Sequence, residues 1–389
     1  MRLRDYSLVT DKSYASEDLC LFSGRVPRPS VKIFPYKWKM SDLPEPAKDA
    51  PTVFSCFCGA GGSSLGYKLA GYRSLGGCDL DKRQSAPYRD NLKPKFFYDG
   101  FVKDLVANTP KGMPRLDVLD GSPPCSVFST AGVREGGWGV EKHFREGQAA
   151  QVLDRLFWDF LDVAAAWKPK VIIGENVLGM TKGQAISYLG AIQQDYLKAG
   201  YTGKWYVVDA SKFGLPQRRV RVFFVAVRSD LERKLIKGSP YYAAHKRLAL
   251  KHPNARPVPF SKIRDPRPSE DLFINPDTVL AQHAKKMREL GLYGSLEQVH
   301  ENGSLFNNKR VDTARVLNTV PAAFSVLLVD ERTGHRTLSE RELYLASSWP
   351  MDYVFPSRNA AGYGVGMSVP PAMCASVASA VKDQWLVHL

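Results

Sequence analysis

A single cysteine, Cys125, follows a short apolar strand predicted within residues 117–132. Two prolines come directly before it. Because proline fixes φ and has no N–H to donate, the turn should be stiff and should hold the thiol at the strand end. The small residues that follow leave room for a substrate. A thiolate in that position is a soft nucleophile suited to covalent catalysis. A buried structural cysteine is the alternative.

Three more side chains with chemical potential, Glu175, Arg219 and Arg221, lie at or near predicted strand ends. Glu175 closes a β-branched strand predicted at 170–174. The carboxyl ends of parallel strands meet at one edge of an α/β sheet, so Glu175 should share that edge with Cys125. Arg219 and Arg221 are two residues apart and therefore point to the same side of their strand. A solvated acid and a surface salt-bridge strand are the alternatives.

A glycine turn, with Gly59 and Gly61, follows the strand predicted at 52–57 and precedes a helix. Glycines let the backbone come close to a ligand, and a helix N-terminus favours a carboxylate or a phosphate. The third glycine of the dinucleotide fingerprint is Ser64 here. Asp79 ends the next strand, twenty residues beyond Gly59, and an acid at that distance suits a pair of ribose hydroxyls.

The 389 residues, 44% of them apolar, predict one large and one smaller domain. There is no run of 18 apolar residues and no apolar segment at the start, so we expect a soluble, intracellular protein. The six cysteines do not have paired spacings with histidines. We therefore expect neither a disulfide framework nor a zinc site.

The net charge of +15 indicates a polyanionic partner, most simply nucleic acid. Residues 233–267 hold ten Lys/Arg against one acid, a balance of +9 within 35 residues. Tyrosines, prolines and a phenylalanine are interleaved with these charges. This pattern favours a surface that follows phosphates over a merely solvated face. The DNA-binding candidates are Lys246, Arg247, Lys251, Arg256, Lys262 and Arg264.

Taken in order, these segments resemble the DNA (cytosine-5)-methyltransferases of bacterial or phage type. The resemblance covers roughly residues 52–228 and 312–385. The matching blocks are Phe57-x-Gly59-x-Gly61-Gly, Pro123-Pro-Cys125, Glu175-Asn-Val, Gln217-x-Arg219-x-Arg221, Leu338-Ser-x-Arg-Glu and Gly366-Met367-Ser368-Val. Each block is weak alone, but six in the family's order are strong evidence.

The resemblance implies a doubly wound, Rossmann-like α/β domain that uses S-adenosylmethionine, together with a smaller, irregular target-recognition domain. The implied boundaries are an N-terminal extension at 1–50 lying on the catalytic domain, the catalytic domain at 51–228 and target recognition at 229–311. The catalytic domain resumes at 312–389 and ends in a helix that packs beside the first strand. A glycine-rich loop at 133–150 would close over the substrate base.

The resemblance also assigns roles in methylating cytosine. Cys125 would attack C6 of a cytosine flipped out of double-stranded DNA, Glu175 would hold N3, Arg219 would orient the ring at O2, and Arg221 would support the loop. Residues implied near the cofactor are Phe57, Gly59, Gly61, Asp79, Asp104, Pro123, Leu156, Met367 and Ser368. A helix cap is the alternative role for Asp104, and a plain core position is the alternative for Leu156.

Met367 stands where the family has asparagine. In one interpretation Ser368 or a water takes over the lost hydrogen bond and the ordinary cofactor is used. In the other the pocket accepts a modified sulfonium cofactor. An RNA cytosine-5-methyltransferase and a catalytically silent DNA-binding relative are the rival functions. We expect a metal-free monomer in the cytoplasm of a bacterium or a phage-infected cell.

Overall fold

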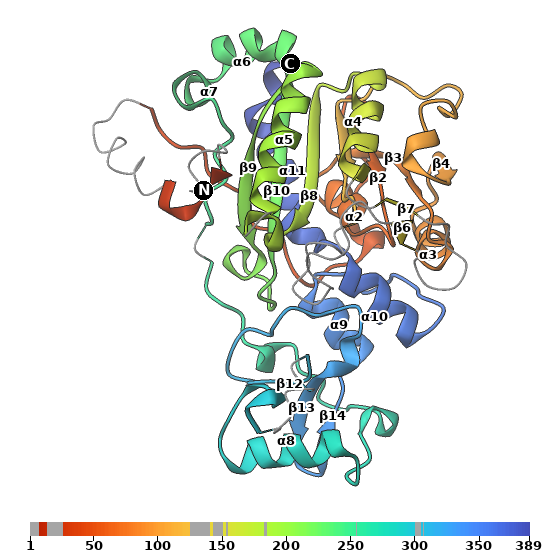
Figure 1. The fold of residues 1–389 in the computed structure, drawn as a ribbon, viewed down its shortest axis with the longest axis vertical. Helices are drawn as coiled ribbons and strands as arrows, with labels where there is room; N and C mark the ends of the chain where they lie inside the picture. Colours follow the sequence, from red (N-terminus) through yellow and green to blue (C-terminus); the bar gives the residue numbers. More distant parts are fainter. Residues whose placement is uncertain are drawn as a thin grey trace.

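The computed structural model describes residues 8–13, 26–124, 141–142, 151–152, 155–182, 185–253, 255–299, 305 and 307–389. The chain forms a large lobe around an eight-stranded sheet and a smaller lobe around a four-stranded sheet. Helices α9 (Glu340–Ala346) and α10 (Arg358–Met367) lie between the two lobes (Figure 1).

The large sheet is parallel apart from one strand. Its order is β1 (Leu8–Val9), β9 (Tyr201–Asp209), β10 (Val220–Arg228), β8 (Val171–Val177), β5 (Val118–Gly121), β2 (Thr52–Cys56), β3 (Arg73–Asp79) and β4 (Phe96–Asp99). Strand β10 runs antiparallel to both of its neighbours. The strands predicted around residues 52, 170, 206 and 221 are confirmed.

Both faces of this sheet are buried, which explains why its strands are almost continuously apolar. Alternate residues enter two separate cores: Val118 and Val171 enter one, Leu119 and Ile172 the other. Helix α11 (Pro371–Gln384) covers the first face, while α4 (Leu156–Trp167) and α5 (Ala185–Lys198) cover the second. The predicted doubly wound α/β fold is confirmed.

The chain reverses its direction across the sheet between β2 and β5. Strands β2, β3 and β4 follow one another toward one side, and β5 and β8 continue toward the other. Ligands of open α/β sheets bind in the crevice at such a switch point, outside the carboxyl ends of the strands. The segments that follow β2 and β5 are the glycine turn and the Pro-Pro-Cys125 segment.

Helix α11 is a core helix that runs beside α2 (Gly62–Leu69). Tyr72 donates a hydrogen bond to the carbonyl of Ala378 at 2.8 Å. Among the described residues, Arg358–His388 is the segment long and apolar enough to cross a membrane. Its most apolar window is 89% buried inside the protein. The apolar stripe predicted at 373–385 therefore reflects packing on all sides of the helix.

Part of the N-terminal extension is described. Strand β1 pairs with β9 at the sheet edge. Trp38 is buried and donates from its indole nitrogen to the carbonyl of Ser348 at 2.8 Å. Asp352 accepts hydrogen bonds from the backbone nitrogens of Met40 and Ser41. These contacts tie residues 38–41 to the segment that follows α9.

The smaller lobe is built on β11 (Gly294–Ser295), β12 (Lys309–Arg310), β13 (Leu327–Glu331) and β14 (Gly334–Arg336), with α8 (Val279–Glu289) against them. Its extent differs from the predicted 229–311 at both ends. Strands β13 and β14 belong to its sheet, because β12 pairs with β13. At the other end, α6 (Glu232–Gly238) and α7 (Pro240–His245) pack on the large lobe, where Tyr242 meets Trp385 edge-on.

A buried ion pair connects the smaller lobe to α9. Arg336 and Glu342 are each fully buried. They form two hydrogen bonds of 2.7 and 2.8 Å, and Arg336 also donates to Glu331 of β13. Such bidentate pairs fix orientation as well as distance. Glu342 also completes a capping box with Ser339 at the start of α9.

Gly76 should be the most sensitive glycine of β3, the strand that ends at Asp79. Its φ is +150°, and a Cβ there would lie 1.6 Å from the carbonyl oxygen of Phe96. We expect Gly76→Ala to lower the free energy of unfolding by more than about 3 kcal/mol, measured by urea denaturation. Gly112→Ala is the control, because its φ of +76° carries strain without any contact within 4 Å. It should cost only about 1–2 kcal/mol. Equal losses would contradict this explanation.

Candidate active site

Glu175 and Arg221 form the polar centre of the carboxyl edge. Arg221 Nε lies 3.1 Å from Glu175 Oε1, and both side chains are largely buried, at 14% and 10% exposed. The antiparallel register of β8 and β10 brings them together, because it sets Arg221 opposite Val177, two residues from Glu175. A partly desolvated carboxyl beside a fixed guanidinium can hold a planar polar ring.

Arg219, which we expected beside the substrate ring, lies away from Glu175. It is 2% exposed, and its two terminal nitrogens donate to the carbonyls of Val320 and Gly366 at 2.9 and 2.8 Å. Its guanidinium therefore joins β10 to the chain that returns from the smaller lobe. Arg221, expected to support a loop, is the arginine beside Glu175.

Asn176 connects Glu175 to the turn that leads to the cysteine. Its side-chain nitrogen donates to the carbonyl of Pro123 at 3.0 Å, and its oxygen accepts from the backbone of Val177 at 2.8 Å. This link holds the Pro-Pro segment against β8. Cys125 lies outside the described residues, and so does the predicted lid at 133–150 except for residues 141–142.

The glycine turn has the backbone geometry expected of a ligand-binding turn. Phe57 has a φ of +53°, uncommon for a residue with a side chain, and Gly59 and Gly61 also have positive φ. Strain of this kind persists only where the surrounding structure holds it in place. Gly61 is the N-cap of α2, so the turn leads directly into the helix N-terminus, where the first N–H groups have no partner within the helix.

Asp79 lies beside this turn at the end of β3. One carboxyl oxygen accepts from Gly59 N at 2.7 Å and the other from Asp81 N at 2.8 Å. Burial raises the pKa of Asp79 to about 6, although these two N–H groups lower it. Gly59 and Asp79 are thus in direct contact.

Ser368 and Met367 approach the same turn from the end of α10. A Cβ added to Gly62 would lie 2.7 Å from that of Ser368, so the two segments are in close contact. The Ser368 hydroxyl donates to the carbonyl of Gly364 at 2.7 Å. Met367 is 54% exposed. Its thioether is therefore not part of the packed core.

The other two candidates for the cofactor have separate surroundings. Asp104 ends the short helix Val102–Asp104 and is half-buried. Leu156, at the start of α4, is 5% exposed and belongs to the core of the second sheet face. The core alternative accounts for what the structure shows of Leu156.

Sequence reasoning missed Asp120 and Asn176. Asp120 is 2% exposed within β5, where an acid is costly unless its surroundings satisfy it. The signal was an acid inside an otherwise apolar strand next to the cysteine turn. Among the described residues, no group of three His, Cys, Asp or Glu side chains could hold a metal ion.

The basic candidates do not form one surface. Lys246 stacks over Tyr242, which contacts Trp385 near the amino ends of the parallel strands, opposite Glu175. In Figure 1, α7 lies at the far end of the molecule from the smaller lobe. Arg247 follows Lys246, and Lys251 adjoins His252 at the end of β9. Arg256 and Lys262 are exposed, and Arg264 pairs with Glu331.

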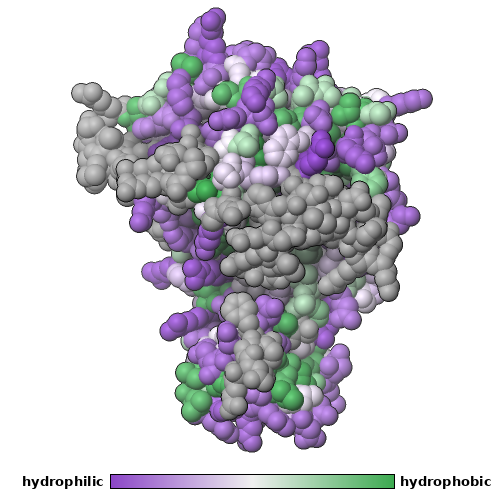
Figure 2. Space-filling model, in the orientation of Figure 1, coloured by the Kyte–Doolittle hydropathy of each residue, from purple (hydrophilic) through white to green (hydrophobic). Residues whose placement is uncertain are grey.

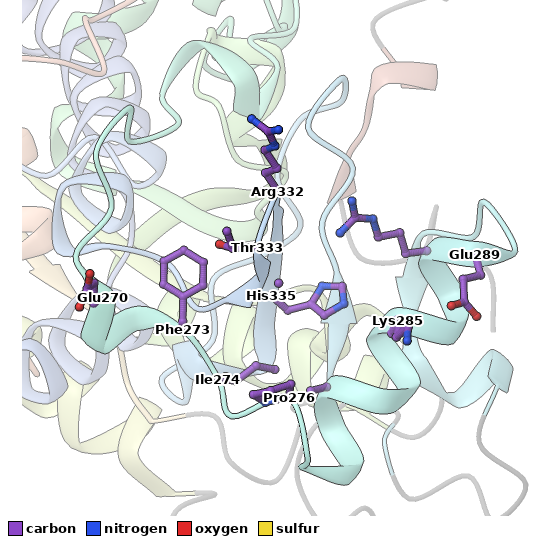
Figure 3. Close-up of a pocket in the computed structure, with 12 residues that line it drawn as sticks. Glu270, Phe273, Ile274, Pro276, Lys285, Glu289, Arg332, Thr333 and His335 are labelled. Carbon is purple, nitrogen blue, oxygen red and sulfur yellow. The ribbon is translucent and has the colours of Figure 1, made fainter.

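A pocket of about 880 Å³ opens in the smaller lobe between α8 and β14. Figure 3 shows Phe273 on one side, Lys285 and Glu289 of α8 on the other, and His335 between them. Lys285 and Arg332 are exposed cations at this pocket. Among the residues coloured in Figure 2 most of the surface is hydrophilic, and apolar residues gather in small patches on this lobe.

The chain belongs to the C-5 cytosine-specific DNA methylase family, whose profile matches residues 52–383. Enzymes of this family use S-adenosylmethionine. The match runs through both lobes and includes the glycine turn, the Pro-Pro-Cys125 segment and Glu175. It confirms the resemblance found from the motifs.

Similar proteins include two named as type II methyltransferases. M.BsuFI of Bacillus subtilis is 26% identical over 86% of this chain and 73% of its own length. M.Sau96I of Staphylococcus aureus is 29% identical over 46% of this chain, which spans only 39% of that protein. A solved structure of a Spodoptera frugiperda DNMT2 variant shares the fold, with a TM-score of 0.60, 13% identity and coverage of 86% and 99% of the two chains.

Arg219 should carry more stability than its neighbour Arg218. We expect Arg219→Lys to cost about 2–3 kcal/mol, because a single ammonium cannot reach both carbonyls and one is left buried without a partner. The comparison is Arg218→Lys, an exposed position, which should stay within about 0.5 kcal/mol. Urea midpoints at unchanged m-value measure both. Similar midpoints for the two variants would show that the fork at Arg219 is dispensable.

Proposed function

We propose that this protein is a DNA (cytosine-5)-methyltransferase that transfers a methyl group from S-adenosylmethionine to C5 of a cytosine. The observation that carries the proposal is the Glu175–Arg221 pair at the same sheet edge as the Pro-Pro turn that precedes Cys125. The family match across residues 52–383 supports it.

The proposed chemistry begins with the thiolate of Cys125 adding to C6 of the ring. This step breaks the aromaticity of cytosine and makes C5 enamine-like, while charge develops at N3. Glu175 meets that charge with a hydrogen bond or a proton at N3. Arg221, rather than Arg219, is placed to hold O2, because its guanidinium contacts Glu175.

S-adenosylmethionine supplies the electrophilic methyl group when it is bound. Loss of the C5 proton and expulsion of the Cys125 thiolate then restore the aromatic base. None of these ring atoms is accessible inside a duplex, so the target nucleotide has to leave the helix. We place it at the carboxyl edge of the large sheet, beside Glu175 and Arg221.

Several residues around the glycine turn suit the cofactor. Phe57, Gly59 and Gly61 form a turn with positive φ at a helix N-terminus, which favours the methionine carboxylate. Asp79 faces the same turn and can accept from ribose hydroxyls. Ser368 lies against Gly62 of the turn from the α10 side, and Met367 precedes it. Pro123 and Asp104 are proposed as further cofactor contacts, and Leu156 is a core residue.

Double-stranded DNA is the proposed substrate, and RNA is not favoured, because the family and the type II relatives are DNA methyltransferases. We propose that the chain acts as a cytoplasmic monomer and modifies DNA as part of a restriction–modification system. Its relatives' type II names support the last point.

Cys125→Ala tests the covalent step. We expect methyl transfer to fall by at least about 10³-fold while DNA binding survives, since the phosphate contacts are untouched.

Glu175→Gln should slow single-turnover transfer by about 10²-fold or more, because an amide cannot supply a proton. Transfer of labelled methyl to DNA measures both. A few per cent of wild-type turnover in Cys125→Ala would refute the mechanism.

The salt dependence of DNA binding tests which cations face DNA. We propose that Lys285 and Arg332 of the smaller lobe contact phosphates. Lys285→Gln with Arg332→Gln should weaken binding and flatten the slope of log K against log salt by about one unit per lost contact. Lys246→Gln is the matched control, because Lys246 lies at the opposite end of the sheet. If Lys246→Gln flattened the slope and the double variant did not, DNA would bind at the end of the sheet where Lys246 lies, and the proposed contacts of Lys285 and Arg332 would be wrong.

Met367→Asn separates the two interpretations of the altered motif. If the ordinary cofactor is used, wild type yields 5-methylcytosine and the variant binds the cofactor equally or more tightly, by up to about 1 kcal/mol for one hydrogen bond. Cofactor titration and mass spectrometry of the product base give both results. A base heavier than 5-methylcytosine, made in cells by the wild type, would favour a modified cofactor.

A further inference from the structure

Asp120 is a buried carboxyl that the proposed mechanism does not use. It is 2% exposed, in β5, and is paired by register with Ser55 of β2 and Ile173 of β8. Cys125 follows five residues later. Asp120 thus lies on the strand that leads to the nucleophile, directly beside the strand that leads to the glycine turn.

Buried hydroxyls extend from Asp120 under the glycine turn. Tyr67 of α2 donates to Asp120 Oδ1 at 3.3 Å. Ser64, also on α2, donates to Ser55 at 3.1 Å and lies 3.1 Å from the hydroxyl of Tyr88 on α3. Each of these residues is fully buried. This polar network therefore joins β5, β2, α2 and α3 behind the surface that would receive the cofactor.

The carboxyl is suited to its place when it carries a proton. Among the described residues, Asp120 Oδ2 makes no hydrogen bond of ordinary geometry, although the hydroxyls of Ser55 and Ser63 are near. Burial raises the pKa of Asp120 to about 7, and the charge of Glu175 adds to the rise, while Ser63, Ser55 and Tyr67 lower it. A protonated Oδ2 could donate to a nearby serine, whereas an ionised one would place a second negative charge near Glu175.

The other titratable groups facing Asp120 stay neutral in this range. Burial raises the pKa of each of them well above neutrality: Cys56 of β2, Tyr67 of α2, Tyr88 of α3 and Cys374 of α11. Glu175 of β8 is the remaining acid. A change near pH 7 in this network would therefore point to Asp120.

We propose that Asp120 is a positioning residue that holds α2 against β5, so that the cofactor turn and the nucleophile segment are presented together. Its protonated form is the competent one. The inference rests on the proposed function, since it assumes that the turn after β2 binds S-adenosylmethionine. A purely structural acid would lower stability without a specific effect on the cofactor.

Cofactor binding measured by calorimetry without DNA tests the proposal. Asp120→Asn keeps the shape and the acceptor for Tyr67, and should bind S-adenosylmethionine within about twofold of wild type at pH 6.5. Asp120→Ala should bind it at least about tenfold more weakly, as expected for one or two lost hydrogen bonds. DNA affinity should be unchanged in both. Asp162→Asn, at an exposed site on α4, is the control and should have no effect.

The pH profile provides a readout that a structural role would not produce. Wild-type affinity for the cofactor should fall as pH rises through about 7, because Asp120 then loses its proton. Asp120→Asn cannot ionise, so its profile should lack that fall. Titration of the cofactor itself and of Asp79 affects both proteins equally and cancels in the comparison.

Two results would overturn the proposal: Asp120→Ala binding the cofactor as tightly as wild type, or superimposable pH profiles for wild type and Asp120→Asn. If Asp120→Ala does not fold, Tyr67→Phe takes its place, with an expected loss of about threefold to tenfold. No loss in Tyr67→Phe would equally overturn it. Wild type that binds the cofactor but methylates no cytosine would contradict the proposed function alone.

Discussion

The parallel strands of the large sheet all end at one edge, and the positions of the glycine turn, Asp79, the Pro-Pro segment and Glu175 depend on this constraint. Strands β2, β3, β5 and β8 deliver the glycine turn, Asp79, the Pro-Pro segment and Glu175 to the same side. Because crossovers between parallel strands are right-handed, a chain that winds first one way from β2 and then the other way from β5 has to leave a crevice between them. The glycine turn and the Pro-Pro segment, which are far apart in sequence, thereby become neighbours.

Two buried arginines fix how the chain that returns from the smaller lobe packs against the large sheet. Arg219 binds the carbonyls of Val320 and Gly366, and Arg336 binds Glu342 of α9. Each guanidinium is a planar, rigid fork that donates to two separate acceptors in a fixed geometry, which the compact ammonium of a lysine does not reproduce. The return from the smaller lobe therefore meets the large sheet in one orientation, and that orientation sets Ser368 against Gly62.

The sequence predicted well what depends on local pattern and poorly what depends on distant partners. Strand β8, the glycine turn and α11 follow from periodicity and turn chemistry. The alternation rule predicted Arg219 and Arg221 on one side of a strand, but Arg219 precedes β10 and has different partners from Arg221. The rule could not tell which would be covered, because Val320 and Gly366, which bury Arg219, lie a hundred residues or more along the chain. The end of the smaller lobe was misplaced for the same reason, since β13 joins β12 only through pairing.

The sequence also showed how many basic residues the chain has but not where in the fold they lie. Residues 233–267 supply +9 of the net +15, yet the run begins at the amino edge of the sheet. Strand β8 has seven residues, so at about 3.3 Å each the two edges lie roughly 20 Å apart. This separation exceeds the Debye length of about 8 Å at physiological salt. The cations at the start of the run can therefore add little to the electrostatic potential beside Glu175.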